Sequence, residues 1–269
     1  SSLVAVGAEA LKQNTDGTGN TAVGRKALES NTTGDSNTAV GSFALDANTT
    51  AGNNTAVGLN CMTANTTGGQ NTAVGSACLD ANTTGEKNIA MGVAAMGANT
   101  TGDQNVALGY TAMFENTTGE KNTAVGYGAL SANNADLNTA VGRSALGSNT
   151  SGTGNVAVGS EAFDANTTGS FSTACGSLAL TSSTTGSGNT GLGRRALQEN
   201  TTASDNTAVG IEALRNNTTA SNNTAVGSET LKENTTGTGN TGIGAEALND
   251  NTTASNNTAV GYLALTKNT

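Results

Sequence analysis

Residues 20–36 read NTAVGRKALESNTTGDS, and residues 37–53 read NTAVGSFALDANTTAGN. This pattern returns along the whole chain of 269 residues, with the tetrad Asn-Thr-Ala-Val or a close variant followed each time by Gly. We number the positions of the repeat from 1 at Asn20 to 17 at Ser36. The copy that starts at Asn122 is one residue shorter, because Asn133-Asn134-Ala135 replaces the usual Asn-Thr-Thr-Gly. A fixed period of this size predicts a solenoid in which each repeat forms one coil.

Positions 2 to 5 predict a short strand followed by a corner. Position 2 is always β-branched, position 3 is always Ala or Gly and position 4 is always apolar, as in Thr21, Ala22 and Val23. Such a triplet favours a strand whose two faces differ in size. Position 5 is Gly in every copy, which indicates a positive φ or a close backbone approach. The first glycines of this column after Gly7 are Gly24, Gly41, Gly58 and Gly75.

The second half of the repeat predicts another strand and another corner. Ala27-Leu28 and its equivalents supply a large apolar residue, and Asn31, three residues later, suits a turn because its amide bonds the local backbone. Gly and Asn-Thr-Thr interrupt every helical pattern. We therefore predict an all-β chain: a parallel β-solenoid or β-roll of about sixteen 17-residue coils with two short strands per coil. It forms a single repeat array over residues 1–269, with no separate cap or globular domain.

Composition and charge exclude several classes of protein. The chain has 37 Gly, no Pro, Trp or His, and a net charge of −9. An acidic chain lacks the cations that bind nucleic acid or an anionic membrane surface. No apolar run is long enough to span a bilayer, so neither nucleic acid nor membrane insertion is expected.

The tiny residues at position 3 predict self-association. We expect Val23 and Leu28 to fill the core of the coil and Ala22 to lie on the opposite face of the strand. A column restricted to Ala and Gly is typical of burial against another backbone. The expected partner is therefore the chain itself, about a common axis, as a homotrimer.

Residues 122–130, Asn-Thr-Ala-Val-Gly-Tyr-Gly-Ala-Leu, resemble the repeats of bacteriophage tail-fibre proteins, which often end in a self-cleaving chaperone domain of the endosialidase type. The repeat is more distantly similar to the YadA-like head repeat of trimeric autotransporter adhesins, with its Asn-Ser-Val-Ala-Ile-Gly core. The resemblance implies a homotrimeric β-roll on a virion or outside a cell. The period here is longer than that of the adhesins, and the chain contains neither a chaperone domain nor an anchor. The resemblance therefore implies a shaft segment of a longer fibre.

No residue pattern points to catalysis, a cofactor or a metal. Without His, His-based acid–base catalysis and most zinc sites are excluded. Asp46 and Asp80 share position 10 two coils apart, and we expect both to be solvated. Cys61 and Cys78 share position 8 in adjacent coils and Cys175 occupies position 4; we expect buried free thiols.

Three features leave room for a binding function. Asn31-Thr32-Thr33 and its equivalents at Asn48, Asn65 and Asn82 match the N-glycosylation pattern, although a turn alone explains them. The consecutive Thr residues give one outward column, which is a candidate for ice binding. Exposed aromatic residues are the candidates for glycan binding, namely Phe43, Tyr110, Tyr127 and Tyr262.

We thus predict a non-catalytic structural shaft segment of a phage tail fibre or cell-surface adhesin. It would be extracellular, at a cell surface or on a virion, and would extend or present a tip that binds a host-surface glycan or protein. The alternative is a binding module that uses a repetitive solenoid face to bind ice or a surface glycan.

Overall fold

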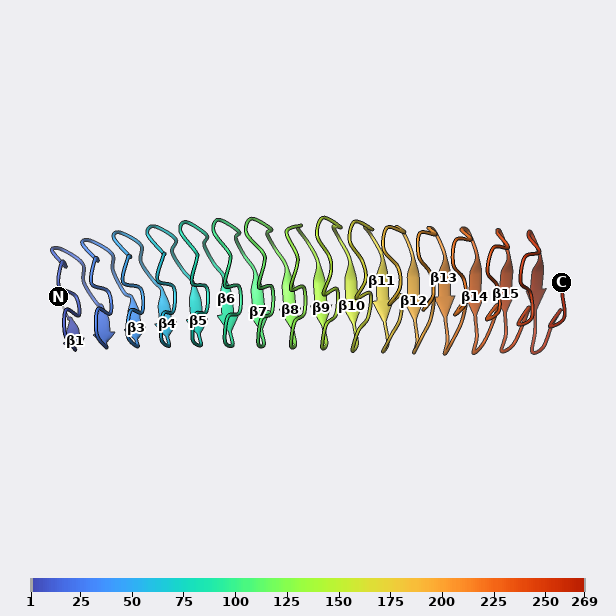
Figure 1. Ribbon diagram of the computed structural model, residues 1–269, viewed down its shortest axis with the longest axis horizontal. Helices are drawn as coiled ribbons and strands as arrows, with labels where there is room; N and C mark the ends of the chain where they lie inside the picture. Colours follow the sequence, from blue (N-terminus) through green and yellow to red (C-terminus); the bar gives the residue numbers. More distant parts are fainter. Residues whose placement is uncertain (1, 269) are drawn as a thin grey trace. The chain divides into compact units, whose positions relative to one another are not determined.

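The computed structural model describes residues 2–268, which fold as a parallel β-solenoid with coils of about seventeen residues. The chain divides into two compact units, one ending at Asp136 and the other beginning at Leu137. Within each unit the coils stack side by side, and each coil contributes one strand to a parallel sheet (Figure 1). The described residues include no helix. The all-β solenoid expected from the repeat is therefore confirmed.

Each strand has three residues, at positions 2 to 4 of the repeat. The first unit contains β1 (Val4–Val6), β2 (Thr21–Val23), β3 (Thr38–Val40), β4 (Thr55–Val57), β5 (Thr72–Val74), β6 (Ile89–Met91), β7 (Val106–Leu108) and β8 (Thr123–Val125). The second contains β9 (Thr139–Val141), β10 (Val156–Val158), β11 (Thr173–Cys175), β12 (Thr190–Leu192), β13 (Thr207–Val209), β14 (Thr224–Val226), β15 (Thr241–Ile243) and β16 (Thr258–Val260). Neighbouring strands pair like with like: Thr21 lies opposite Thr38, and Val23 opposite Val40.

The strand faces are the reverse of the prediction. Ala22 is fully buried inside its own coil, whereas Val23 is 36% exposed on the outside. The interior is narrow: a Cβ added to Gly191, at position 3, would lie 3.4 Å from Cγ of Leu180 and 3.3 Å from the carbonyl oxygen of Ala196. Position 3 is therefore small because the far wall of the same coil is close. The small residues at position 3 therefore do not require a second chain to explain them. The prediction that Val23 lies in the core was wrong.

The predicted second strand is also absent. Lys26 and Leu28, at positions 7 and 9, have φ angles of 60° and 51°, and the equivalent residues of the other coils share this left-handed conformation. A left-handed residue with a Cβ costs about 1–2 kcal/mol. Full burial of Leu28 offsets this cost, because burying a leucine contributes about 1.5–3 kcal/mol. The segment is thus a tight bend that turns the large side chain inward.

The glycine at position 5 of every repeat has both features that its invariance along the chain indicated, a positive φ and a close backbone approach. Gly58 has a φ of 146°, and a Cβ added to it would lie 2.2 Å from the carbonyl oxygen of Gly75 in the next coil. The same close approach recurs from Gly24 to Gly41 and from Gly41 to Gly58. Neighbouring coils therefore touch backbone to backbone at this corner.

Two columns of buried asparagine brace each coil from inside. In the coil that starts at Asn37, the side-chain amides of Asn37 and Asn48 both donate to the carbonyl oxygen of Ala51, at 2.8 and 3.1 Å. Across coils, the Asn48 amide also donates to Oδ1 of Asn31 at 2.8 Å, and Oδ1 of Asn37 accepts from the Asn54 backbone N–H at 3.0 Å. Asn31 thus stabilises the interior of the coil as well as a corner.

The shorter repeat keeps this arrangement. Asn122 and Asn133 both donate to the carbonyl oxygen of Ala135, each at 2.8 Å. The missing residue belongs to the segment between Asn133 and Ala135. The shortened segment still places the Ala135 carbonyl oxygen within reach of both asparagine amides. This coil is the last of the first unit.

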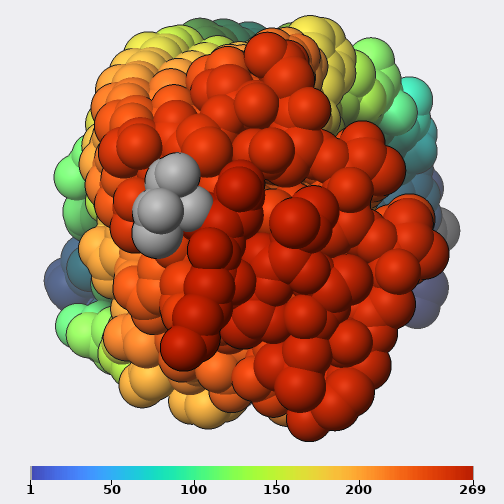
Figure 2. All heavy atoms as spheres, turned by 90° about the vertical axis from the view of Figure 1, so that its right-hand side faces the viewer, coloured from blue at the N-terminus to red at the C-terminus, as the bar shows by residue number. Residues whose placement is uncertain are grey.

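One coil lacks both amide donors. Ser172 and Ser183 occupy positions 1 and 12 of the same coil and are buried. Their hydroxyls still accept bonds from the next coil, from the Asn189 backbone N–H and the Asn200 amide. Serine is too short to supply the two bonds that the position 15 carbonyl receives in the other coils. The apolar interior of this coil is kept, since Ala174, Ala179 and Leu180 are fully buried. Figure 2 looks onto the last coils of the second unit, which form the face turned to the viewer.

Replacing Gly58 by Ala should lower the free energy of unfolding by at least about 2 kcal/mol. The backbone of an alanine would be strained at this φ, and its Cβ would collide with the Gly75 carbonyl oxygen. Thermal unfolding followed by circular dichroism measures the change. Gly128→Ala is the matched control, because Ala77 and Ala94 adopt the same left-handed conformation at that position. Equal destabilisation by both variants would contradict this account.

The double variant Ser172→Asn/Ser183→Asn should be more stable than the parent chain by about 1–2 kcal/mol. It restores two buried hydrogen bonds worth about 1 kcal/mol each, and Asn155 and Asn189 already occupy the position 1 space in adjacent coils. Chemical denaturation measures the difference. An unchanged or lower stability would show that the two donors are not needed.

Candidate functional site

The outer β-face of each unit is the most distinctive surface of the molecule. We define it as the side chains at positions 2 and 4, on strands β1–β8 in the first unit and β9–β16 in the second. It carries no charged residue, only Thr, Val, Ile, Leu, Met and one Cys. Its apolar side chains remain exposed, as at Val40 (37%), Met91 (45%) and Ile243 (43%). The face is therefore a regular apolar and hydroxyl stripe open to solvent.

In the first unit an aromatic and aliphatic column flanks this face. Position 6 is exposed at Leu59, Val93, Tyr110 and Tyr127. The rings of Tyr110 and Tyr127 stack with centroids 5.4 Å apart and an interplanar angle of 12°. Because the two rings cover each other's inner faces, they leave no open platform on which a sugar could lie between them.

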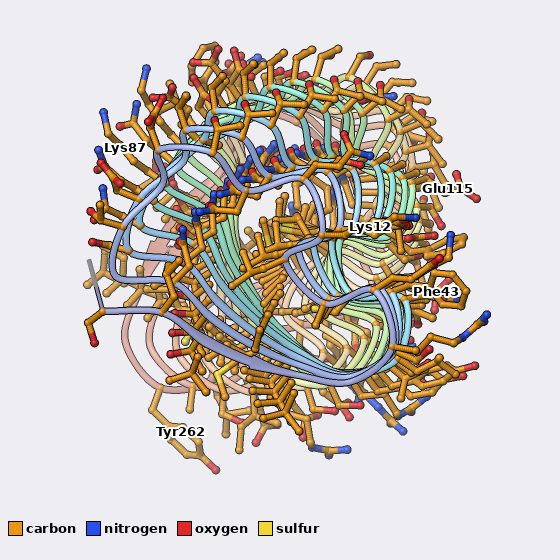
Figure 3. All side chains as sticks on the ribbon, turned by 90° about the vertical axis from the view of Figure 1, so that its left-hand side faces the viewer. Lys12, Phe43, Lys87, Glu115 and Tyr262 are labelled. Carbon is orange, nitrogen blue, oxygen red and sulfur yellow. The ribbon has the colours of Figure 1, made fainter. Side chains whose placement is uncertain are left out.

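The other two aromatic candidates do not stack on this pair: Phe43 is at another position of the repeat, and Tyr262 is in the other unit. Phe43, at position 7, is half-buried beneath the Arg25 guanidinium, 4.3 Å from its ring centroid, although its side chain points away from the coil interior, as do those of Lys87 and Glu115 (Figure 3). Tyr262, at position 6 of the second unit, is 71% exposed. The four aromatic residues predicted for glycan binding therefore do not form one site.

Positions 7 and 10 carry ion-pair networks. In the second unit Glu212 is nearly buried and meets four cations: Arg194 and Arg195 at 3.4 Å, Lys232 at 3.3 Å and Arg215 at 3.5 Å. Burial alone would raise the pKa of Glu212, but the hydrogen bond from Lys232 and the charges of Arg215, Lys232 and Arg194 together lower it. In the first unit Lys26 pairs with Glu29 at 3.0 Å and Glu9 at 3.5 Å. These networks stabilise the bends between coils.

Asp46 and Asp80 do not form a carboxylate pair. Thr63 lies between them in the same column and donates a hydrogen bond to Asp80. Asp46 is only half-exposed, and burial raises its pKa. Asp80 is half-exposed as well, so the prediction that both are ordinary solvated residues overstates their exposure.

The three cysteines are free, and two are buried as predicted. The thiols of Cys61 and Cys78 donate to the carbonyl oxygens of Ala73 and Ala90, at 3.4 and 3.2 Å. The hydrogen bond with Cys78, together with burial, raises the pKa of Cys61, so its reactive thiolate is disfavoured. Cys175 is exposed, contrary to prediction, because position 4 faces outward.

The Asn-Thr-Thr segments are inaccessible at their Asn. Asn31, Asn48, Asn65 and Asn82 are fully buried. The Asn65 amide, for example, donates to Asn48 at 3.1 Å and to Gly68 at 3.0 Å. A glycan cannot be attached there without opening the coil.

The two threonines that follow differ from each other. The Thr32 hydroxyl donates to the Thr49 carbonyl at 3.0 Å, whereas Thr33 is exposed. The single outward Thr column predicted for this corner is therefore confirmed.

Residues 2–268 contain no pocket and no group of three or more His, Cys, Asp or Glu side chains placed to hold a metal ion. No helix in the described part of the chain could cross a membrane. The sequence pattern missed the outer β-face because it assigned the larger strand residue to the core. The range of sizes at position 4 does not identify this face, because the buried position 9 varies as widely, from Leu28 to Met62 and Phe163.

No family model matches the chain, and a search of curated proteins finds no relative. Its function therefore has to be argued from the geometry of its surfaces.

Replacing Glu212 by Gln should lower the free energy of unfolding at pH 7 by about 1–2 kcal/mol, because four cations would lose their shared carboxylate. The folded-state pKa of Glu212 lies below its ordinary value of 4.5. The contribution of the ionised Glu212 to the free energy of unfolding is thus complete above about pH 4.5. It is lost as the pH falls through the lower folded-state pKa.

Denaturation of both proteins between pH 3 and pH 7 checks this expectation. Glu246→Gln is the control, because Glu246 shares position 7 but has no ion pair among residues 2–268. A Glu212→Gln deficit that persists unchanged to pH 3 would show that the loss is one of packing.

Proposed function

We propose that the chain is a structural shaft segment that associates with copies of itself through the outer β-face, as a homotrimer. The observation that carries this proposal is the continuous stripe of uncharged, exposed or half-exposed side chains along each unit. At about 4.8 Å per coil, eight coils extend about 38 Å, so the stripe covers on the order of 400 Å² per unit. The largest apolar patch of a typical monomer covers about 300–600 Å² and is often functional.

The shape of the stripe favours a second copy of the chain as partner. It runs parallel to the stacking direction, and residues of one type repeat in register, as in the column from Val23 to Val40 to Val57. Copies placed around an axis parallel to the stack would bring like columns together along their whole length. The number three rests on the resemblance of the repeat to tail-fibre and adhesin repeats.

A mechanical role is supported by the interior of the coil. Each coil is tied to the next by backbone bonds, by the asparagine columns and by the hydroxyl of position 13, as from Thr49 to the Thr66 carbonyl. Every coil must break several of these bonds together to move, so the stack resists bending and stretching.

The remaining parts of the proposal concern location and role. By its resemblance, the segment belongs to a phage tail fibre or cell-surface adhesin, works outside the cell or on a virion, and extends or presents a tip without catalysing a reaction. The tip, rather than this segment, would recognise a host-surface glycan or protein.

Light scattering coupled to size-exclusion chromatography tests the association. The expected mass is three times 26.2 kDa. The triple variant Val40→Lys/Val57→Lys/Val74→Lys should yield monomers, because it places three charges on the outer β-face. A parent chain that is a monomer at all concentrations would overturn the proposal.

The matched control is Thr50→Lys/Thr67→Lys/Thr84→Lys, which adds the same charges to position 14 of the same three coils. It should remain trimeric. Dissociation of both variants would show that general repulsion, and not the outer β-face, controls assembly.

A further inference from the structure

The second unit has an uncharged polar surface that the shaft proposal does not use. We call it the hydroxyl array: the side chains at positions 14 and 16 of seven consecutive coils. Its members are Ser151 and Thr153, Thr168 and Ser170, Thr185 and Ser187, Thr202 and Ser204, Thr219 and Ser221, Thr236 and Thr238, and Thr253 and Ser255. Every one is Ser or Thr. The first unit differs, because its position 16 includes Asp35, Glu86, Asp103, Glu120 and Asp136.

Both columns of the array face solvent. The residue between them, at position 15, is buried, as at Ala203 (2%) and Ala220 (1%). On either side of Ala203, Thr202 is exposed and Ser204 half-exposed. Most coils of the unit repeat this order of an exposed, a buried and a half-exposed residue, so the two hydroxyl columns run in parallel along the unit.

The position 16 oxygens are held in place by the backbone. Oγ of Ser187, Ser204 and Ser221 each accepts the backbone N–H of the preceding position 16 residue, at 3.0 Å. That bond uses one lone pair and leaves the O–H free to donate outward. The position 14 hydroxyls of Thr185, Thr202 and Thr219 make no hydrogen bond within residues 2–268, unlike the position 13 hydroxyls beside them. The array thus presents hydrogen-bond donors and acceptors to water at a regular spacing along the unit.

The spacing of these groups fits ordered water. Successive coils in a parallel ladder are about 4.8 Å apart. In a tetrahedral water network with O–H···O distances of about 2.75 Å, second-neighbour oxygens lie about 4.5 Å apart. The mismatch of about 0.3 Å per coil adds up to about 1 Å over three or four coils, or about a quarter of that distance. The hydroxyls of a few neighbouring coils can therefore take the place of a short row of water oxygens in a crystal.

The chemistry of the array favours ice over other ligands. Neither of its two columns carries a charge to attract an ion or an aromatic ring to stack on a sugar, and no pocket among the described residues could enclose a small molecule. Position 17, beside the array, carries the exposed Phe171 and Asp205, each in one coil alone. Charged groups orient water around themselves, so their absence from both columns matters for contact with a neutral lattice. We propose that the hydroxyl array of the second unit binds the surface of ice. This proposal is independent of the self-association proposed above, which uses the outer β-face.

Thermal hysteresis of the full chain tests the proposal. The parent protein should open a gap between the melting and freezing temperatures and shape growing ice crystals into facets. The variant Thr185→Lys/Thr202→Lys/Thr219→Lys should lose most of that gap. Thr185→Val/Thr202→Val/Thr219→Val should also reduce it, since valine keeps the shape but removes the hydroxyl.

The control is again Thr50→Lys/Thr67→Lys/Thr84→Lys, which makes the same change in the first unit, where acidic residues interrupt position 16. It should keep the gap of the parent. A parent chain without hysteresis, or an equal loss in the two lysine variants, would overturn the proposal. Light scattering on the same samples reports assembly separately, so failure of one proposal does not imply failure of the other.

Discussion

The buried carbonyl oxygen at position 15 is the acceptor around which most coils are organised; the coil with Ser172 and Ser183 is the exception. It points into the interior, where an unpaired carbonyl is costly, and two asparagine amides reach it from opposite walls of the coil, as Asn37 and Asn48 reach Ala51. No other side chain of this length can donate to that oxygen and also accept from the next coil. The two asparagine columns follow from this arrangement. The sixteen-residue coil shows that the bonds do not depend on the exact number of residues, since its deletion leaves both bonds to Ala135 intact.

The interior that these bonds define is too narrow for two large side chains at one level. Leucine at position 9 fills it, and position 3 is left with room for a methyl group. The branched residue at position 8 shows how tightly the two sides are matched. Cys61 and Cys78 replace the usual Ala there while position 3 of the next coil stays Ala. Thr230 also replaces Ala, but position 3 of the next coil is Gly242, where an added Cβ would lie 2.6 Å from Cγ2 of Thr230. The extra atoms on one wall are thus accommodated by removing a methyl group from the other.

A consequence of the narrow interior is that the larger apolar residues of the strand are placed outside. Each unit therefore presents an uncharged, partly exposed face, together with a separate hydroxyl surface in the second unit. The two surfaces differ in chemistry and lie at different positions of the repeat. The self-association that we propose would use the outer β-face and the ice contact that we propose would use the hydroxyl array, so the two proposals call on different surfaces.

The seventeen-residue period, the parallel stacking and the invariant corner at Gly58 could all be predicted from the sequence alone, because a strict repeat forces like residues to stack. The direction in which each side chain points could not. Alternation along a three-residue strand distinguishes Ala22 from Val23 but does not say which of them is inside, and general hydrophobicity favoured the wrong one. Only the folded coil decides this, since the far wall lies within van der Waals distance of position 3. The left-handed conformation of Leu28 was equally hidden, because it is local strain that only burial of the same side chain offsets.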